Sequence, residues 1–150
     1  KYIDTQHAIA VSNGSAALDI AVKAMGFEAG DEVIMPTFTI ISPAQSLVTF
    51  GIKPVLVDSD PVTWNMDVTQ IEAKITSKTK AIVPVHLFGQ NADMESILEI
   101  AKAHELYVIE DACQSIGSEY TFADGRKMPC RDDLFFLSLG TCDLSGVGFV

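Results

Sequence analysis

The stretch "TKAIVPVHLFGQNADMESILEIAKAHELYVIE" (residues 79–110) contains two apolar runs separated by a segment with helical spacing. The runs at 79–86 and 106–110 are short and rich in β-branched residues, as buried strands are. Residues 92–105 carry apolar side chains three or four positions apart, which is the period of an amphipathic helix. A strand, a helix and a second strand in this order predict two parallel strands joined by a helical crossover.

The same alternation continues through the rest of the chain. The pattern predicts further strands at 7–11, 31–36, 53–58, 134–138 and 147–150, helices at 15–27, 42–51 and 67–75, and a polar loop at 121–133. Nearly continuous apolar strands that alternate with helices indicate a sheet buried on both faces. The predicted fold class is therefore α/β, with three layers: a mostly parallel sheet and helices on both of its faces.

The composition is that of a globular domain with an acidic surface. The chain has 150 residues, of which 48% are hydrophobic, and this length suits one domain spanning residues 1–150. Twenty acidic against ten basic residues give a net charge of −10, whereas nucleic acids and anionic membranes require a basic surface. No apolar stretch approaches the roughly 20 residues of a membrane-spanning helix. We therefore expect neither a nucleic-acid partner nor a membrane.

The cysteines and the chain ends bear on location and completeness. Cys113, Cys130 and Cys142 are odd in number, and the sequence contains no CxxC pair or Cys/His zinc spacing. We expect reduced thiols, a cytoplasmic protein and no metal site. The chain begins at Lys1 without a methionine and ends at Val150 inside an apolar run, so we expect it to be part of a longer protein.

Unusual residues gather where the predicted strands end, which is where parallel sheets bind ligands. Gly14 and Ser15 begin a helix, whose N–H groups suit an anion, although an ordinary helix cap is the alternative. Neither GxxxxGK[ST] nor GxGxxG is present. Asp111 suits a protonated ring nitrogen, an arginine or a metal, or else a loop hydrogen bond, while the adjacent Glu110 is expected to reach solvent. His86 is either a general base or a partner of a nearby backbone group.

Four stretches together resemble one known family: "AVSNGSAALDIAV", "GDEVIMPTFTIISPAQSLVTFGIKPVLVDSD", "TKAIVPVHLFGQNADMESI" and "YVIEDACQSIGSEY". In this order they resemble the DegT/DnrJ/StrS family of sugar aminotransferases, fold-type I enzymes that use pyridoxal 5′-phosphate (PLP). The resemblance covers about residues 7–120. It implies most of a PLP-binding large domain, without the leading helix and the C-terminal small domain of full-length members.

The resemblance also implies roles for individual residues. Gly14 and Ser15 match the turn that holds the cofactor phosphate, and Ser138 matches a serine that adds a phosphate contact. Asp111 matches the aspartate that pairs with the pyridinium nitrogen of the cofactor. Such pairing compensates a desolvated carboxylate and keeps the ring an electron sink.

Two positions match the ring itself, and one departs from the family pattern. Gln114 matches the side chain packed against the ring face, and Ile40 stands where the family often has a stacked aromatic residue. The Schiff-base lysine of the family falls on Asp143. The nearest lysine is Lys127, in the polar loop, and no histidine follows His104. The resemblance therefore leaves open whether this chain is an enzyme.

The function implied by the resemblance is transamination of a nucleotide-linked keto sugar in polysaccharide or antibiotic sugar biosynthesis. Glutamate is the expected amino donor, and a homodimer is expected because the family's active site lies at a dimer interface. Two alternatives remain: a sugar dehydratase that uses pyridoxamine 5′-phosphate (PMP), and a truncated or lysine-less inactive domain. The sequence does not identify the sugar, the nucleotide or the pathway.

Overall fold

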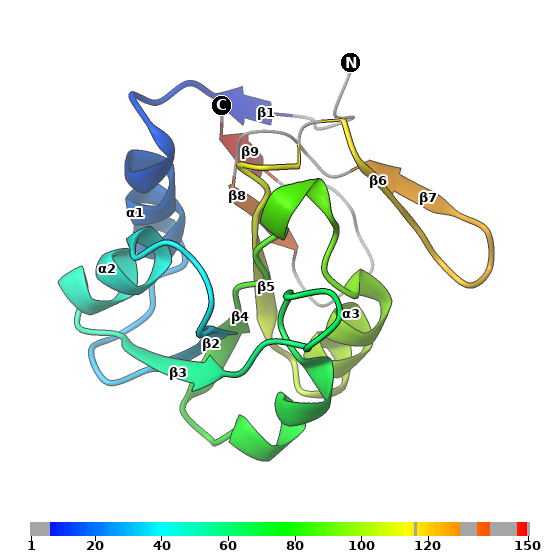
Figure 1. Cartoon of the computed structure of the whole chain (residues 1–150). Helices are drawn as coiled ribbons and strands as arrows, with labels where there is room; N and C mark the ends of the chain where they lie inside the picture. The colour runs from blue at the N-terminus through cyan, green and yellow to red at the C-terminus, as the bar shows by residue number, and fades with distance from the viewer. Residues whose placement is uncertain (1–6, 116, 130–134, 139–146, 150) are drawn as a thin grey trace.

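A seven-stranded sheet forms the centre of the computed structural model, which describes residues 7–115, 117–129, 135–138 and 147–149 (Figure 1). The spatial order of its strands is β1-β9-β8-β5-β4-β2-β3. They are β1 (His7–Ile9), β2 (Glu32–Pro36), β3 (Lys53–Val57), β4 (Thr79–Ile82), β5 (Tyr107–Asp111), β8 (Phe135–Ser138) and β9 (Val147–Phe149). Of these, only β8 is antiparallel to its neighbours, β5 and β9. The prediction of a mostly parallel sheet is confirmed.

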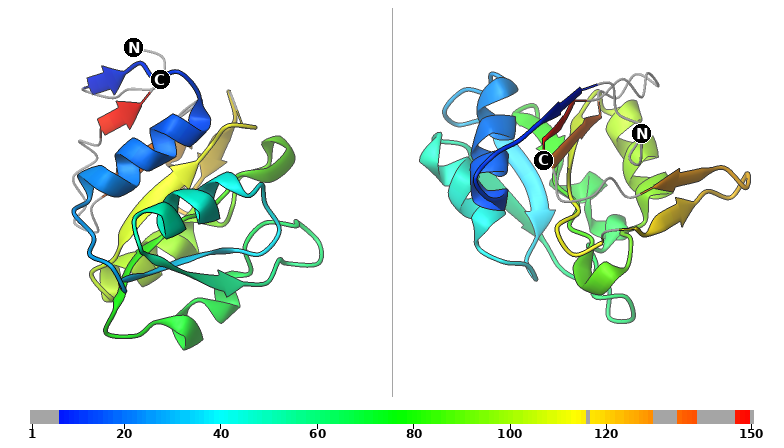
Figure 2. Two further views of the ribbon diagram at one scale, coloured as in Figure 1. Left: turned by 90° about the vertical axis from the view of Figure 1, so that its left-hand side faces the viewer. Right: turned by 90° about the horizontal axis from the view of Figure 1, so that it is seen from above.

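Helices cover both faces of this sheet (Figure 2). On one face lie α1 (Gly14–Ala24) and α2 (Ser42–Thr49), and on the other lies α3 (Met94–Ala103). The described residues also form three short 3₁₀ helices: η1 (Val68–Gln70), η2 (Glu72–Lys74) and η3 (Leu87–Gly89). The predicted three layers are confirmed, and no helix in the described part of the chain is long and apolar enough to cross a membrane.

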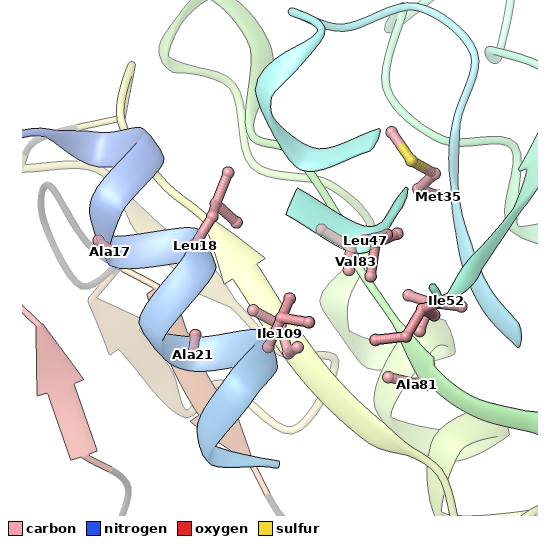
Figure 3. Packing of buried hydrophobic residues seen from close by; sticks show 11 residues of the cluster. Ala17, Leu18, Ala21, Met35, Leu47, Ile52, Ala81, Val83 and Ile109 are labelled. Atoms are coloured by element: carbon pink, nitrogen blue, oxygen red, sulfur yellow. The ribbon is translucent and has the colours of Figure 1, made fainter. Parts of the chain in front are cut away.

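Successive strand residues supply two separate hydrophobic cores. Val33 and Met35 of β2 pack with α1 and α2, whereas Ile34 packs with the α3 side. In β5, Ile109 belongs to the first core, which Figure 3 shows, and Val108 belongs to the second. Side chains alternate between the two faces of a strand, so burial on both faces requires an uninterrupted apolar run.

The helix predicted at 67–75 is wrong in type, because the structure has η1 and η2 there. Asp67 accepts hydrogen bonds from the Thr69 N–H (3.0 Å) and from the Gln70 side chain (2.7 Å). Such local side-chain bonds offer the backbone an alternative to the α-helix. Ile71, between the two turns, is fully buried and satisfies the apolar pattern without a continuous helix.

The polar loop predicted at 121–133 is partly wrong. An antiparallel hairpin lies there instead, formed by the strands β6 (Glu119–Thr121) and β7 (Lys127–Pro129). It projects away from the seven-stranded sheet (Figures 1 and 2). At its turn, Asp124 accepts bonds from the backbone N–H (2.9 Å) and Nε (2.6 Å) of Arg126. A short polar turn between two weakly apolar segments carries little strand signal, so the alternation rule misses it.

Candidate functional site

A cavity of about 290 Å³ lies at the carboxyl ends of the parallel strands. Its walls come from the start of α1 (Asn13, Gly14, Ser15, Leu18), the loop before α2 (Thr39, Ile40, Ser42), and the segments that end β4 and β5 (Val85, Asp111, Cys113, Gln114). The cavity therefore brings together Gly14, Ser15, Ile40, Asp111 and Gln114, all of which were predicted from sequence as site residues.

The N-terminus of α1 offers hydrogen-bond donors to this cavity. Asn13 caps the helix, with its side-chain oxygen 2.9 Å from the Ala16 N–H and its carbonyl 3.1 Å from the Ala17 N–H. The N–H groups of Gly14 and Ser15 precede these bonds, and such first-turn groups have no partner inside a helix. Together with the positive end of the helix dipole, they suit an anion.

Gly14 faces the segment that follows β5. A Cβ atom at this position would lie 3.4 Å from Cys113 Sγ, which is an ordinary van der Waals contact. The start of α1 and Cys113 therefore lie side by side in the cavity wall. Cys113 is exposed and lines the same cavity.

Two hydroxyl groups in the cavity wall were not predicted from the sequence. Ser42 Oγ accepts a hydrogen bond from Ser15 Oγ at 3.1 Å, and Thr39 Oγ1 is buried without a hydrogen-bond partner among the described residues. A buried polar group without a partner costs about 1–3 kcal/mol, so Thr39 is a position where a ligand atom would be favourable. Sequence analysis assigned Ser42 only to a helix start, although the "PTFTIIS" segment that carries both hydroxyls follows a predicted strand, as the other site segments do.

Asp111 is a buried acid whose side chain lines the cavity. Its residue is 4% exposed, and its Oδ1 accepts one long bond from the Cys113 N–H at 3.3 Å. The backbone of Asp111 is held firmly: its N–H donates to the Pro84 carbonyl, and its carbonyl accepts from the His86 N–H, both at 2.9 Å. Since a carboxylate can accept about four hydrogen bonds, this one retains capacity for a cationic donor in the cavity.

Glu110 differs from the expectation that it reaches solvent. It is 3% exposed, and its Oε2 lies 3.2 Å from His86 Nε2. His86 is fully buried and accepts the Ala92 N–H at Nδ1 (3.0 Å), so a neutral imidazole carries its proton on Nε2, toward Glu110. His86 does not line the cavity. Its backbone-binding alternative is confirmed, and the expectation for Glu110 is wrong because strand alternation turns that side chain away from the cavity toward His86.

The remaining predicted residues divide into two groups. Gln114 is held by the backbone, since its Oε1 accepts the Phe88 N–H at 2.9 Å, and Ile40 is 63% exposed at the cavity. Ser138 pairs with Val108 in the sheet rather than with Asp111, and its side chain lies outside what the structure describes. Asp143 also lies outside the described residues, so its role stays a prediction.

A second hollow, of about 390 Å³, lies beside the cavity and is lined by Thr37, Phe38, Asp58, Ser59, Asp60, Pro61 and Trp64. The Phe38 ring is 5.6 Å from that of Trp64 and 6.4 Å from that of Phe88. All three aromatic residues are exposed, and Trp64 and Phe88 have φ angles of 63° and 57°. This left-handed backbone is unusual for bulky residues.

The structure is that of an α/β domain with one cavity lined by a helix N-terminus and a buried acid. A model of the DegT/DnrJ/EryC1/StrS aminotransferase family matches residues 1–134. The chain belongs to this family, which confirms the resemblance found in the sequence.

Similar proteins support the same assignment. GDP-perosamine synthase of Caulobacter vibrioides is 53% identical over 119 residues, which are 79% of this chain and 32% of that protein. The Bacillus subtilis NtdA structure with bound cofactor PMP is 44% identical, with a TM-score of 0.69, over 71% of this chain and 24% of that one. A GDP-4-keto-6-deoxymannose-3-dehydratase with a trapped PLP-glutamate geminal diamine is 30% identical, with a TM-score of 0.69, over 77% and 31% of the two chains. The chain spans about a third of the length of the curated relatives it matches.

Proposed function

We propose that the cavity binds PLP or PMP. The observation that carries this proposal is that one cavity holds both a helix N-terminus, at Gly14 and Ser15, and a buried acid, Asp111. A ligand with a phosphate at one end and a protonated ring nitrogen at the other satisfies both groups. The unpartnered hydroxyl of Thr39 fits the same ligand.

Each residue then has a separate task. The N–H groups of Gly14 and Ser15 bind the phosphate, with an additional contact from Ser138. Asp111 holds the proton on the ring nitrogen, while Gln114, fixed by the Phe88 N–H, and Ile40 pack against the ring. When bound, the cofactor supplies a ring that accepts electrons during amino-group transfer.

We infer that the whole protein is a sugar aminotransferase, of which this chain is most of the large domain. Its proposed substrate is a nucleotide-linked keto sugar, which is supported by the similarity to GDP-perosamine synthase. Glutamate is the proposed amino donor, in line with the glutamate trapped in the similar dehydratase structure. The aromatic hollow beside the cavity suits either the substrate or a second copy of the chain, and we propose a cytoplasmic homodimer.

One observation favours a second candidate, a PMP-dependent sugar dehydratase. None of the described residues that line the cavity is a lysine, and a dehydratase is among the similar structures. PMP carries its own amine and needs no lysine for anchoring. If Asp143 occupies the lysine position, a domain that binds the cofactor without turnover is the remaining alternative.

Calorimetric titration with PMP tests the proposed function. PLP has an aldehyde that reacts with surface lysines. PMP has no aldehyde and does not label them. We expect saturable binding with one site per chain, and competition by PLP. Heat signals that stay at the level of buffer dilution up to millimolar PMP would refute the proposed cofactor site.

A further inference from the structure

Two helix N-termini, not one, meet at the cavity. The start of α1 contributes Gly14 and Ser15, and the start of α2 contributes Ser42, whose Oγ lies 3.1 Å from Ser15 Oγ. The two helices approach the cavity from segments 27 residues apart in sequence. Their positive dipole ends and first-turn N–H groups therefore act on the same region of the cavity.

The start of α2 differs from that of α1 in its capping. Asn13 caps α1 with its side chain, whereas the N-cap residue of α2 is Ile41, which makes no side-chain capping bond. Pro43 has no N–H group to satisfy, but the first-turn N–H groups of Ser42 and Ala44 remain as donors. An uncapped helix start beside a capped one leaves room for an external anion.

Thr39 supplies the independent observation that points to a ligand. Thr39 lines the cavity, and its Oγ1 is buried without a hydrogen-bond partner among the described residues. The starts of α1 and α2, which line the same cavity, carry hydroxyl and N–H groups. Asp111 is the one acidic side chain among the described cavity-lining residues. An oxyanion can accept hydrogen bonds from the Thr39 hydroxyl and from the first-turn N–H groups of α2 together, whereas a cation would face those N–H groups with nothing to offer them.

We propose that Thr39, Ser42 and the N-terminus of α2 form a second wall of the phosphate site. This inference rests on the proposed function and extends it to residues that the sequence motifs did not include. A phosphate group has three strong acceptor oxygens, and these can accept more hydrogen bonds than the first-turn N–H groups of α1 supply. Ser15 donates to Ser42, so Ser42 is free to donate its own proton to a phosphate oxygen. Thr39 donates to another.

The proposed wall also explains how the cavity orients its ligand. Donors and two helix N-termini come from α1 and α2, and the Asp111 carboxyl group comes from the end of β5. A ligand with a negative and a positive end therefore fits in one direction only. Reversal would place the phosphate beside an acid and the ring nitrogen beside helix N-termini.

Titration of matched variants with PMP and with pyridoxamine, which lacks the phosphate, tests this proposal. Ser42→Ala and Thr39→Val each remove one hydroxyl. Ser77→Ala and Thr49→Val are the controls, since both residues are exposed and neither lines the cavity or the neighbouring hollow. Far-UV circular dichroism and thermal melting establish that each variant is folded.

We expect Ser42→Ala and Thr39→Val each to weaken PMP binding about tenfold, as loss of a hydrogen bond to a charged group does. Pyridoxamine binding and the control variants should change less than about twofold. PMP affinities of both variants equal to wild type, or equal losses for PMP and pyridoxamine, would overturn the second wall while leaving the cofactor site intact. Failure of the wild-type chain to bind PMP would instead refute the proposed function on which the inference rests.

Discussion

The imidazole of His86 and the carboxyl group of Glu110 form a buried pair, with His86 Nε2 3.2 Å from Glu110 Oε2 and side chains 0% and 4% exposed. The pair joins the segment that follows β4 to the end of β5. The next residue, Asp111, lies on the opposite face of β5 and lines the cavity. The pair therefore anchors the end of β5, which carries the proposed cofactor-binding acid, on the face of the strand opposite to Asp111.

Breaking this pair from the histidine side should destabilise the protein strongly. His86→Leu leaves the Glu110 carboxyl group buried without its partner and removes the acceptor of the Ala92 N–H, so we expect a loss of about 3–5 kcal/mol in the free energy of unfolding. Glu110→Gln keeps an acceptor for His86 Nε2–H and should lose about 1 kcal/mol or less. Urea denaturation of the two variants measures both values, and equal losses would contradict the arrangement.

Asp111 should matter to cofactor binding far more than Glu110. Asp111→Asn keeps the size of the side chain but removes the charge that holds a protonated ring nitrogen. We expect PMP affinity to fall about ten- to a hundredfold, as for a hydrogen bond to a charged group. Glu110→Gln, on the other face of β5, is the matched control, and calorimetric titration compares the two. Similar affinities for both variants would remove Asp111 from the site.

Glu32 should make folding stability sensitive to acid. Its carboxylate accepts hydrogen bonds from Thr76 Oγ1 (2.6 Å) and Lys53 Nζ (2.9 Å), and these contacts lower the pKa of Glu32 below its ordinary value of 4.5. A lowered pKa stabilises the folded state above the ordinary pKa, and this stabilisation disappears as the pH falls through the lowered value. Unfolding free energies of wild type and Glu32→Gln should therefore differ at pH 7 and converge toward pH 3. A difference that does not change with pH would contradict this linkage.

We predict that the residue at position 143 decides whether the cofactor can be anchored covalently. If Asp143 occupies the lysine position, borohydride treatment with PLP should attach no stoichiometric pyridoxyl group to any single lysine. Asp143→Lys should create one such attachment, detectable by peptide mass spectrometry. A pyridoxyl group on one specific lysine of the unmodified chain would show that the family alignment of residues 134–150 is wrong.

The aromatic residues beside the cavity motivate a prediction about assembly. Phe38, Trp64 and Phe88 are 45%, 53% and 73% exposed and lie in ring contact, which is unusual for an isolated surface. We expect a dimer that covers this cluster. Analytical ultracentrifugation should show it, and Trp64→Ser should weaken it. A single monomeric species at tens of micromolar would count against the predicted homodimer.

The spacing of apolar residues predicted strands and helices well where no side-chain hydrogen bond competed with it. Val33–Met35 and Val108–Ile109 are buried on both faces, so their strands appear as apolar runs. The rule failed at 67–75, because hydrogen bonds that the Asp67 side chain accepts compete with the helix that the apolar spacing indicates. It also missed the β6–β7 hairpin, whose strands are too short to show a period.

The sequence by itself determined the fold class, the family, and the placement of Gly14, Ser15, Ile40, Asp111 and Gln114 at strand ends, because periodicity and motifs are local properties of the chain. Only the tertiary structure decided that Glu110 pairs with His86 and that Ser42 reaches Ser15. These contacts join residues 24 and 27 positions apart, and the packing of the strands and of the two helices brings them together. The same holds for the unpartnered hydroxyl of Thr39, since burial is a property of the packed molecule and no local pattern encodes it.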